Sequence, residues 1–516
     1  MKRAWWPESG HRRRGAGRLP VDGQQRRTNP SLQAFLQLWF RANVTLASRN
    51  GKGAPRQPER RLVRCSPMRA AHAPPLATNA TMSDIVTLPS TRSSTDLETV
   101  YQKVTRRVVP LLFVCYLLAY LDRINIGYAQ LQMRSELNFS DAVYGLGASM
   151  FFVGYVLFEV PSNVILKKIG ARKTMLRIML CWGAVSMSTM FVASPLEFYV
   201  ARFFLGVFEA GFFPGILFYL TLWFPADRRA RIVAFFMAAT VAAGMISGPV
   251  SGYILQNMNG VHGLQGWQWM FLLEGFPSVL LGIVSYLSLD DGPSDARWLS
   301  TAEKHAITRD LAEGSRDVPE QSVTHREAFR SMAVYRLSAL YFSMSCAAYA
   351  LSFWMPSLIE RAGTVGMQRI GSISIIPYAC GVIAMIGYSR HSDRTRERRW
   401  HFAFAVLLGA VALALCNWTE GMLWTSVALI SVSLAAVISS FPVFWAVATS
   451  VLRKESAAVG IAIITSLGGV AGIICPYAIG LIKTSTGSLN YGLYCCSGIL
   501  VVSSVVMLRM KTDSRR

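Results

Sequence analysis

Apolar stretches of roughly 20 residues recur along the sequence between residues 108 and 509. A stretch of this length is long enough for an α-helix to cross the hydrocarbon core of a bilayer. Lipid offers the backbone no hydrogen-bond partners, so each crossing must be helical. Only 16% of the residues are charged, whereas a soluble chain carries about a quarter. The sequence therefore predicts an all-α membrane protein.

The apolar pattern predicts twelve transmembrane helices, divided six and six by a long polar segment over 290–332. The predicted spans are 108–129, 142–166, 175–193, 197–223, 231–256, 268–289, 334–358, 371–389, 402–416, 422–447, 457–482 and 489–509.

The two groups of six resemble copies of one another. An offset of 226 residues places Val108 on Val334, at the start of the seventh span, and Lys168 on Arg394, in a second basic loop. Internal repeats of this kind are typical of secondary transporters, whose substrate site lies near the membrane midplane between the repeats. We therefore expect two pseudo-symmetric six-helix bundles, over 101–289 and 333–510.

The distribution of basic residues predicts the orientation and the flanking segments. Connections that follow even-numbered spans are rich in Lys and Arg, so both termini, the central loop over 290–332 and the tail 511–516 are expected to be cytoplasmic. Residues 1–100 are expected to form a disordered basic leader. The first 81 residues hold 16 Lys and Arg against 3 Asp and Glu, and we hypothesise that translation starts at Met82. The alternative is a basic arm that touches anionic lipid.

Several function classes are disfavoured by missing motifs. The nine cysteines include no C-x-x-C pair, the histidines form no H-E-x-x-H motif, and we expect neither a metal nor another cofactor. A phosphate-binding G-x-x-x-x-G-K-[ST] loop is also missing, which disfavours ATP-driven transport. The net charge of +23 comes largely from the leader and the loops, so it does not indicate nucleic-acid binding. The sequence indicates a transporter rather than an enzyme.

The predicted spans contain charges that are costly to bury. In "RFFLGVFEAGFFPG" (202–215), Arg202 and Glu209 lie on one helix face, about 10 Å apart along the axis. The first span holds Asp122, Arg123 and Asn125 in "YLDRINIGYA". A charge at the centre of a membrane helix costs at least about 2.5–3.5 kcal/mol, so these groups should face an aqueous cavity or one another. An Arg can clamp a carboxylate and a buried acid can take a proton, which together predict a proton-coupled anion site.

Structural interpretations of these charges stay open. Arg202 and Glu209 could form an ion pair without contacting substrate, and Asp122 with Arg123 could be equally structural. Glu159 in "VLFEVPSN" and Glu274 in "FLLEGFPS" lie nearer predicted span ends, and we expect packing or gating roles for both.

Five segments together give the chain a resemblance to the anion:cation symporter family of the major facilitator superfamily. They are "YLDRINIGYA", "GYVLFEVPSN", "KKIGARK", "RFFLGVFEAGFFPG" followed by "YLTLWFP", and "RHSDRTRERRWH". The resemblance covers about residues 100–510 and implies the major facilitator fold with inward proton symport of small organic anions. It assigns Asp122 and Glu209 to proton coupling, and Arg123, Tyr155 and Arg202 to the substrate path.

Further candidate residues come from the charged segment of the first span, from the aromatic residues and from the resemblance. Asn125, Trp445 and Thr465 are expected to contribute to substrate binding, although sugar-acid members typically carry Asn where this chain has Thr465. The basic loops are expected to act in gating, with Lys167 replacing the Asp of the wider superfamily motif. The predicted gating residues are Lys167, Gly170, Arg172, Asp393 and Arg394.

Aromatic residues favour an aromatic carboxylate, such as phthalate or hydroxyphenylacetate, as the expected substrate. Tartrate or a sugar acid is the next candidate. The candidates for stacking on such a ring are Phe353, Trp354, Phe441, Phe444 and Trp445. We expect a monomer in the bacterial inner membrane that binds protons and a small organic anion. A proton-independent exchanger or uniporter is the alternative, and a nutrient sensor would need a signalling appendage larger than the central loop.

Overall fold

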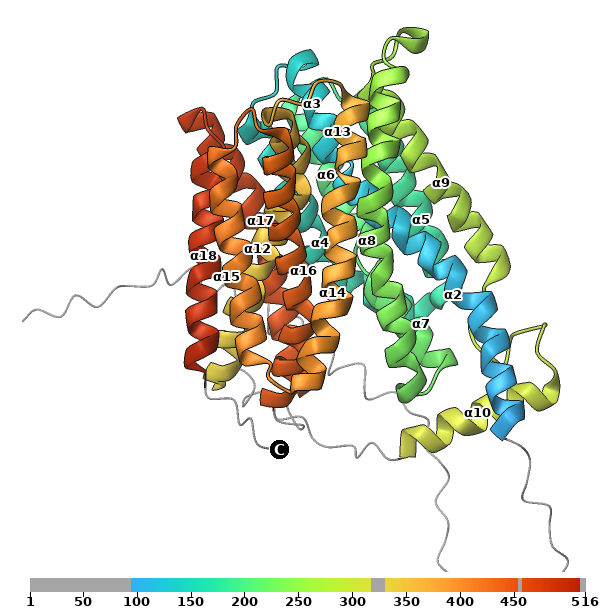
Figure 1. Ribbon diagram of the computed structural model, residues 1–516. Coiled ribbons are helices and arrows are strands. Elements are labelled where there is room, and N and C mark those ends of the chain that lie inside the picture. Colours follow the sequence, from blue (N-terminus) through green and yellow to red (C-terminus); the bar gives the residue numbers. More distant parts are fainter. Residues whose placement is uncertain (1–93, 317–329, 453–456, 511–516) are drawn as a thin grey trace, which may run out of the picture. The chain divides into compact units, whose positions relative to one another are not determined.

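The computed structural model describes residues 94–316, 330–452 and 457–510, which are almost entirely helical (Figure 1). The proposed start at Met82, most of the predicted leader and the predicted tail lie outside the described residues. The helices are α2 Ser94–Ile124, α3 Ile126–Glu136, α4 Asp141–Ile169, α5 Ala171–Ser188, α6 Pro195–Glu209, α7 Phe212–Trp223, α8 Ala226–Asn257, α9 Gly266–Ser288, α10 Thr301–Arg316, α12 Met332–Arg361, α13 Met367–Ile373, α14 Ile375–Thr395, α15 Arg399–Leu415, α16 Leu423–Val451, α17 Ala457–Thr486 and α18 Asn490–Arg509, with short 3-10 turns at Thr189–Phe191, Val261–Gly263 and Cys416–Trp418.

Twelve helical segments of the described residues are long and apolar enough to cross a membrane. This confirms the predicted all-α fold with twelve spans. Three spans consist of two helices each: α2 with α3, α6 with α7, and α13 with α14. A membrane-spanning helix can be interrupted where other protein groups or a cavity satisfy the freed backbone.

Two helical segments lie where the sequence predicts none. Residues 94–100, assigned to the leader from the sequence, form the first two turns of α2. The polar connection over 290–332 contains α10, which lies against α2. The Tyr101 hydroxyl donates to Asp310 at 2.6 Å, and Lys103 pairs with Glu303 at 3.0 Å. These contacts attach the connection to the first helix.

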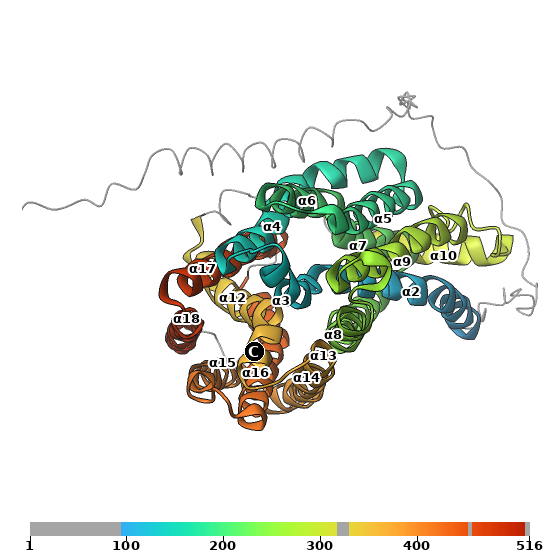
Figure 2. The same cartoon turned by 90° about the horizontal axis from the view of Figure 1, so that it is seen from above.

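The first six spans and the last six pack as two groups of helices, seen along the bundle in Figure 2. In the first group, which we call the N half, α5 packs on α9, α4 on α6, and α2 on α8. In the second group, the C half, α14 packs on α16, α12 on α17, and α15 on α18.

The N and C halves contact each other along two main seams, in which α4 packs on α17 and α8 packs on α13 and α14. Glycines allow the backbones to approach closely. A Cβ placed on Gly145 of α4 would collide with the backbone of Pro476, and one on Gly248 of α8 would collide with the carbonyl of Gly371. Small residues permit this close packing of membrane helices.

Candidate functional site

An ion pair joins the first and fourth spans in the middle of the N half. The Arg123 guanidinium of α2 donates to the Glu209 carboxylate, the last residue of α6. The Glu209 side chain is 1% exposed and that of Arg123 is 14% exposed. The cation also lies over the rings of Phe151 and Tyr155, 5.1 and 5.3 Å from their centroids. The sequence predicts that Arg123, Tyr155 and Glu209 are site residues. In the structure these three side chains lie next to one another.

Arg202 is the second buried cation of this cluster, and it is only 1% exposed. Its guanidinium carbon lies 5.3 Å from the centroid of the Phe151 ring, so one aromatic ring contacts both arginines. None of its three guanidinium nitrogens has a hydrogen-bond partner within the described part of the chain. Arg202 lies within electrostatic range of Glu209. A buried, unpartnered cation of this kind is an unusually strong indication of an anion site.

A helix break places Glu209 in this cluster. The predicted uninterrupted span 197–223 ends its first helix at Glu209 and resumes at Phe212, because Gly211 has a φ of +84°. That conformation favours glycine, and a Cβ at this position would collide with the Ser162 side chain.

Asp122 points into a different environment. Its carboxylate accepts hydrogen bonds from Trp182 Nε1 at 2.7 Å and the Ser186 hydroxyl at 3.0 Å, both on α5. Asn125 Nδ2 and the Ser278 hydroxyl lie at 3.4 Å. The sequence predicts that Asp122 shares a pocket with Arg202 and Glu209. In the structure its shortest hydrogen bonds go to α5, while Arg202 and Glu209 lie within electrostatic range of it.

The predicted substrate-binding residues of the C half lie in several different environments. Trp445 is half-buried and packs 5.4 Å from the Tyr341 ring. Thr465 is exposed, and its hydroxyl donates to carbonyls of its own helix. Phe353 and Trp354 are buried, and the carbonyl of Phe353 accepts from the Tyr144 hydroxyl. These two aromatic residues are packing residues in this conformation.

The predicted gating loops lie at the same end of the bundle as α10. Gly170 has a φ of +85° and ends α4, while the backbone N–H of Arg172 donates to Asp291 at 3.0 Å. Lys167, Asp393 and Arg394 are exposed. The Arg172 guanidinium also donates to the Tyr286 carbonyl of α9, in the same half.

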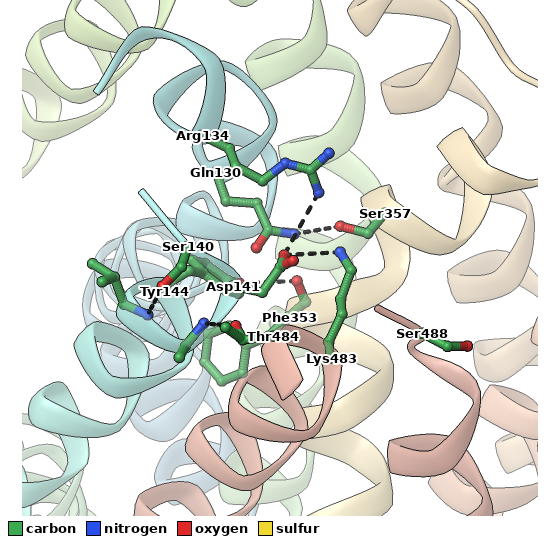
Figure 3. Close-up of polar contacts among 12 residues, drawn as sticks. Gln130, Arg134, Ser140, Asp141, Tyr144, Phe353, Ser357, Lys483, Thr484 and Ser488 are labelled. Carbon is green, nitrogen blue, oxygen red and sulfur yellow. Dashed lines mark hydrogen bonds and ion pairs between the residues drawn. The ribbon is translucent and has the colours of Figure 1, made fainter. Parts of the chain in front are cut away.

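The opposite end of the bundle is held closed by polar contacts between the halves (Figure 3). Lys483 of α17 pairs with Asp141 of α4 at 2.8 Å, and Asp141 also lies 3.6 Å from Arg134. We call this the closed end, meaning the contacts of α3, α4 and α8 with α12, α13 and α17. Its additional hydrogen bonds join Gln130 to Ser357, Tyr144 to Phe353, and Ala142 to Thr484.

The charged cluster lies next to the closed end, since Arg202 is within electrostatic range of Tyr144. Along α4 the contacts of the closed end run from Asp141 to Val156, which faces Gly469 of α17. Tyr155, under the Arg123 guanidinium, is at the same level. Sequence reasoning missed Phe151 as the ring shared by both arginines and Trp182 as a donor to Asp122. Phe151 lies one turn before Tyr155 and could have been found by helical spacing, whereas Trp182 had no sequence signal.

Comparisons with known proteins agree with the fold and the site's membrane setting. The family model described as "Major Facilitator Superfamily" matches residues 112–476. The chain is 44% identical over 416 residues to a protein of Agrobacterium vitis named "Putative tartrate transporter", covering 80% of this chain and 95% of that one. It is 42% identical over 410 residues to "Putative metabolite transport protein NicT" of Pseudomonas putida, covering 80% and 94%. A solved bacterial homologue of the lysosomal transporter Spinster, in an inward-facing occupied conformation, has a TM-score of 0.66 at 15% identity, covering 81% and 98%.

Proposed function

The chain belongs to the Major Facilitator Superfamily, and from this we propose that it carries a small organic carboxylate together with a proton by alternating access of its two halves. It is a multi-pass membrane transporter, not an enzyme. Its basic loops support an orientation with both termini in the cytoplasm of a bacterium. In that orientation the closed end faces away from the cytoplasm, and transport is directed inward.

The observation that carries the proposal is the buried guanidinium of Arg202, which has no partner among the described residues, next to the Arg123–Glu209 pair. A substrate carboxylate can bind Arg202 through two parallel hydrogen bonds. The Phe151 ring contacts both guanidinium groups and so helps to hold them in position.

Charge balance links substrate binding to proton uptake. With Glu209 ionised, the two arginines and this acid carry one net positive charge, which matches a single carboxylate. Asp122 lies within electrostatic range of Arg202 and Glu209, so this balance requires a protonated Asp122. A dicarboxylate brings a second negative charge and can displace Glu209 from Arg123. Glu209 would then be a buried carboxylate without its cation, a state that is strongly disfavoured unless it takes a proton. Two arginines, a protonated Glu209 and a dicarboxylate are together neutral.

This balance and the relatives named for tartrate favour a tartrate-like dicarboxylate as the first candidate. The aromatic acids favoured by the sequence are the second. Phe441 and Trp445, the two half-buried members of the predicted aromatic set, are the residues that would contact such a ring.

The test uses the purified full-length chain in liposomes with tartrate, phthalate and hydroxyphenylacetate as probes. A proton symporter accumulates the right acid when the outside is more acidic, and the external solution of a weakly buffered suspension becomes alkaline. Glu209→Gln should abolish accumulation driven by the pH gradient but keep counterflow exchange, because the amide imitates the protonated acid. Glu313→Gln on α10, which changes an exposed acid, is the matched control.

Two results would contradict the proposal. Gradient-driven accumulation that survives in Glu209→Gln would favour a proton-independent exchanger or uniporter. Loss of both accumulation and counterflow, in a variant that still folds, would remove Glu209 as the proton carrier and leave it as a structural partner of Arg123.

A further inference from the structure

A pocket of about 460 Å³ lies at the closed end beside the Lys483–Asp141 ion pair, and we call it the vestibule. Its volume falls within the range of about 300–1,000 Å³ that small-molecule sites occupy. Both halves line it, since Arg134 belongs to α3 and the other lining residues belong to the C half. Figure 3 shows Arg134, Ser357 and Lys483 of this lining around Asp141. The charged lining residues are Arg134, Glu360, Arg361, Glu420 and Lys483.

The charge of the vestibule depends on Asp141. The three cations and two acids of the lining leave one net positive charge. Asp141 cancels this charge, because its Oδ1 atom lies 2.8 Å from Lys483 Nζ and 3.6 Å from Arg134 Nη1. One carboxylate oxygen of the protein therefore faces two cations. A carboxylate from solution that takes the place of Asp141 meets the same positive charge.

The three cations keep hydrogen-bonding capacity for such an anion. Arg361 is held by neutral groups, the Asn490 side chain and a backbone carbonyl, and no ion pair among the described residues includes it. The Arg134 side chain is 51% exposed, and its distance of 3.6 Å from Asp141 is too long for a hydrogen bond. Lys483 has three N–H donors, and its hydrogen bond within the described part of the chain is the one to Asp141.

A much smaller cavity lies between the vestibule and the buried arginine of the site. Its volume is about 10 Å³, close to the minimum that holds one water molecule. Arg134 lines both cavities, and Asp141 and Tyr144, one turn apart on α4, line the smaller one. Tyr144 in turn lies within electrostatic range of Arg202. Once the halves separate at Asp141 and Tyr144, an anion in the vestibule can reach Arg202.

We propose that the vestibule is an entry site for the transported acid, in which a carboxylate binds Lys483, Arg134 and Arg361 in the place of Asp141. This site is separate from the one at Arg202. The acid and Asp141 compete for the same ammonium group, so binding in the vestibule and the ion pair between the halves exclude each other. A ligand shifts a conformational equilibrium only through such a difference in affinity between the states. The incoming acid therefore favours the opening of the closed end.

The inference rests on the proposed transport of a small organic carboxylate and does not depend on proton coupling. It assigns the three cations to capture and release of the acid at the surface, where water still reaches them. Arg202 then binds the acid inside the bundle, where its guanidinium has no partner among the described residues. Binding in the vestibule is expected to be the weaker of the two and to decrease in high salt, because exposed charges are screened.

The first measurement is equilibrium binding of radiolabelled tartrate, phthalate and hydroxyphenylacetate to the purified full-length protein. Arg202→Met removes the buried site, and this variant should still bind at least one of the acids. Combining it with Arg361→Gln should abolish the remaining binding. Combining it instead with Arg369→Gln, which changes an exposed cation of α13 outside the vestibule, should keep that binding.

A further variant in the same assay tests the competition. Asp141→Asn in the Arg202→Met protein should tighten binding about tenfold, because the acid no longer displaces a charge-assisted hydrogen bond. A purely structural Asp141 would give unchanged or weaker binding, and either result would overturn the competition.

The second measurement is the KM of uptake into liposomes for the acid that binds. Arg361→Gln should raise KM about tenfold with kcat unchanged, because one charged contact at the entry site is lost. Glu420→Gln removes an exposed acid of the vestibule and should lower KM about twofold. These opposite changes should both diminish in high salt. If neither substitution changes KM, the role of the vestibule in entry is overturned.

The outcomes separate this inference from the proposed function. If none of the three acids binds the Arg202→Met protein, or if Arg361→Gln leaves that binding unchanged, the entry site is overturned. If the variant with Arg361→Gln does not fold, Glu420→Gln replaces it, and binding that fails to tighten overturns the site as well. If the acids bind as expected but the unchanged protein transports none of them, the proposed function fails and the entry site stands.

Discussion

The two halves have the same helical plan but differ in their buried chemistry. Among the described residues, the spans of the N half bury four acidic or basic side chains: Asp122, Arg202, Glu209 and Glu274. The buried polar residues of the described C half are Ser, Thr and Asn, with no acid or base among them. At the offset of 226 residues, Asp122, Arg202 and Glu209 correspond to Ala348, Ala428 and Ala435.

This difference indicates a division of labour within a duplicated fold. The buried charged groups that can bind an anion or a proton belong to the N half, and the central connection is attached there too, through Tyr101 and Lys103 of α2. The C half supplies small and aromatic residues that pack against the N half at the closed end. We therefore expect substitutions of buried residues in the N half to change binding and coupling, and those of buried residues in the C half to change the movement between states.

The largest expected effect tests the buried charge of the N half. Arg202→Met should lower tartrate uptake about 100-fold or more, because two charge-assisted hydrogen bonds to the substrate are lost. The same change should not lower thermal stability, since replacing an unpartnered buried cation by an apolar side chain removes a desolvation penalty. Uptake in liposomes and thermal unfolding in detergent measure the two effects.

Arg123→Met is the informative comparison. It leaves Glu209 buried without its cation, which is expected to cost about 3–5 kcal/mol, so this variant should lose stability as well as uptake. If Arg202→Met were the less stable of the two, the interpretation of Arg202 as a binding residue rather than a structural one would fail.

An intermediate effect is expected in the C half. Gly480→Ala puts a Cβ against the backbone of Asp141 in α4, and such overpacking costs about 1–3 kcal/mol. The closed end should open more readily and uptake should fall several-fold, with no change in the protons moved per substrate. Gly498→Ala on α18 is the matched control, because a Cβ there meets nothing within 4 Å. If Gly480→Ala changed the number of protons moved per substrate molecule, the proposed division of labour between the N half and the C half would be wrong.

The smallest effect concerns the attachment of α10 to the N half. The pKa of Glu303 is lowered, chiefly because its carboxylate accepts the backbone N–H of Ser300 at 2.7 Å, with Lys103 as a further partner. A lowered pKa in the folded state means that the contact contributes fully above the ordinary Glu pKa of about 4.3 and is lost as the pH falls below it.

Amide hydrogen exchange along α10 measures this contact. We expect slow exchange at neutral pH and a modest loss of protection in acid. Glu303→Gln should remove this dependence of the protection on pH. The contribution is small, because an exposed ion pair is largely screened. If protection in the unchanged protein increased as the pH falls, the expected contribution of the Glu303 contact would be contradicted.

The sequence was sufficient for the twelve spans and the repeat, because hydropathy reports burial in lipid directly. It also placed Arg202 and Glu209 on one face, since helical spacing fixes the relation of residues within one helix. It could not decide which of Asp122 and Arg123 contacts Glu209 directly. Neighbouring residues point about 100° apart on a helix, and the rotation of α2 within the bundle, which decides which of them meets Glu209, is set by packing. The break at Gly211 likewise depends on a close contact with Ser162.

The attachment of α10 to α2 has a practical consequence for following the movement of this protein. Because Asp310 and Glu303 are fixed to the first helix, α10 should travel as a rigid body with the N half. A spin label or fluorophore on an exposed residue of α10, paired with one near the exposed end of α15 at Trp400, would convert the opening and closing of the bundle into a single measurable distance, without placing a probe inside the site.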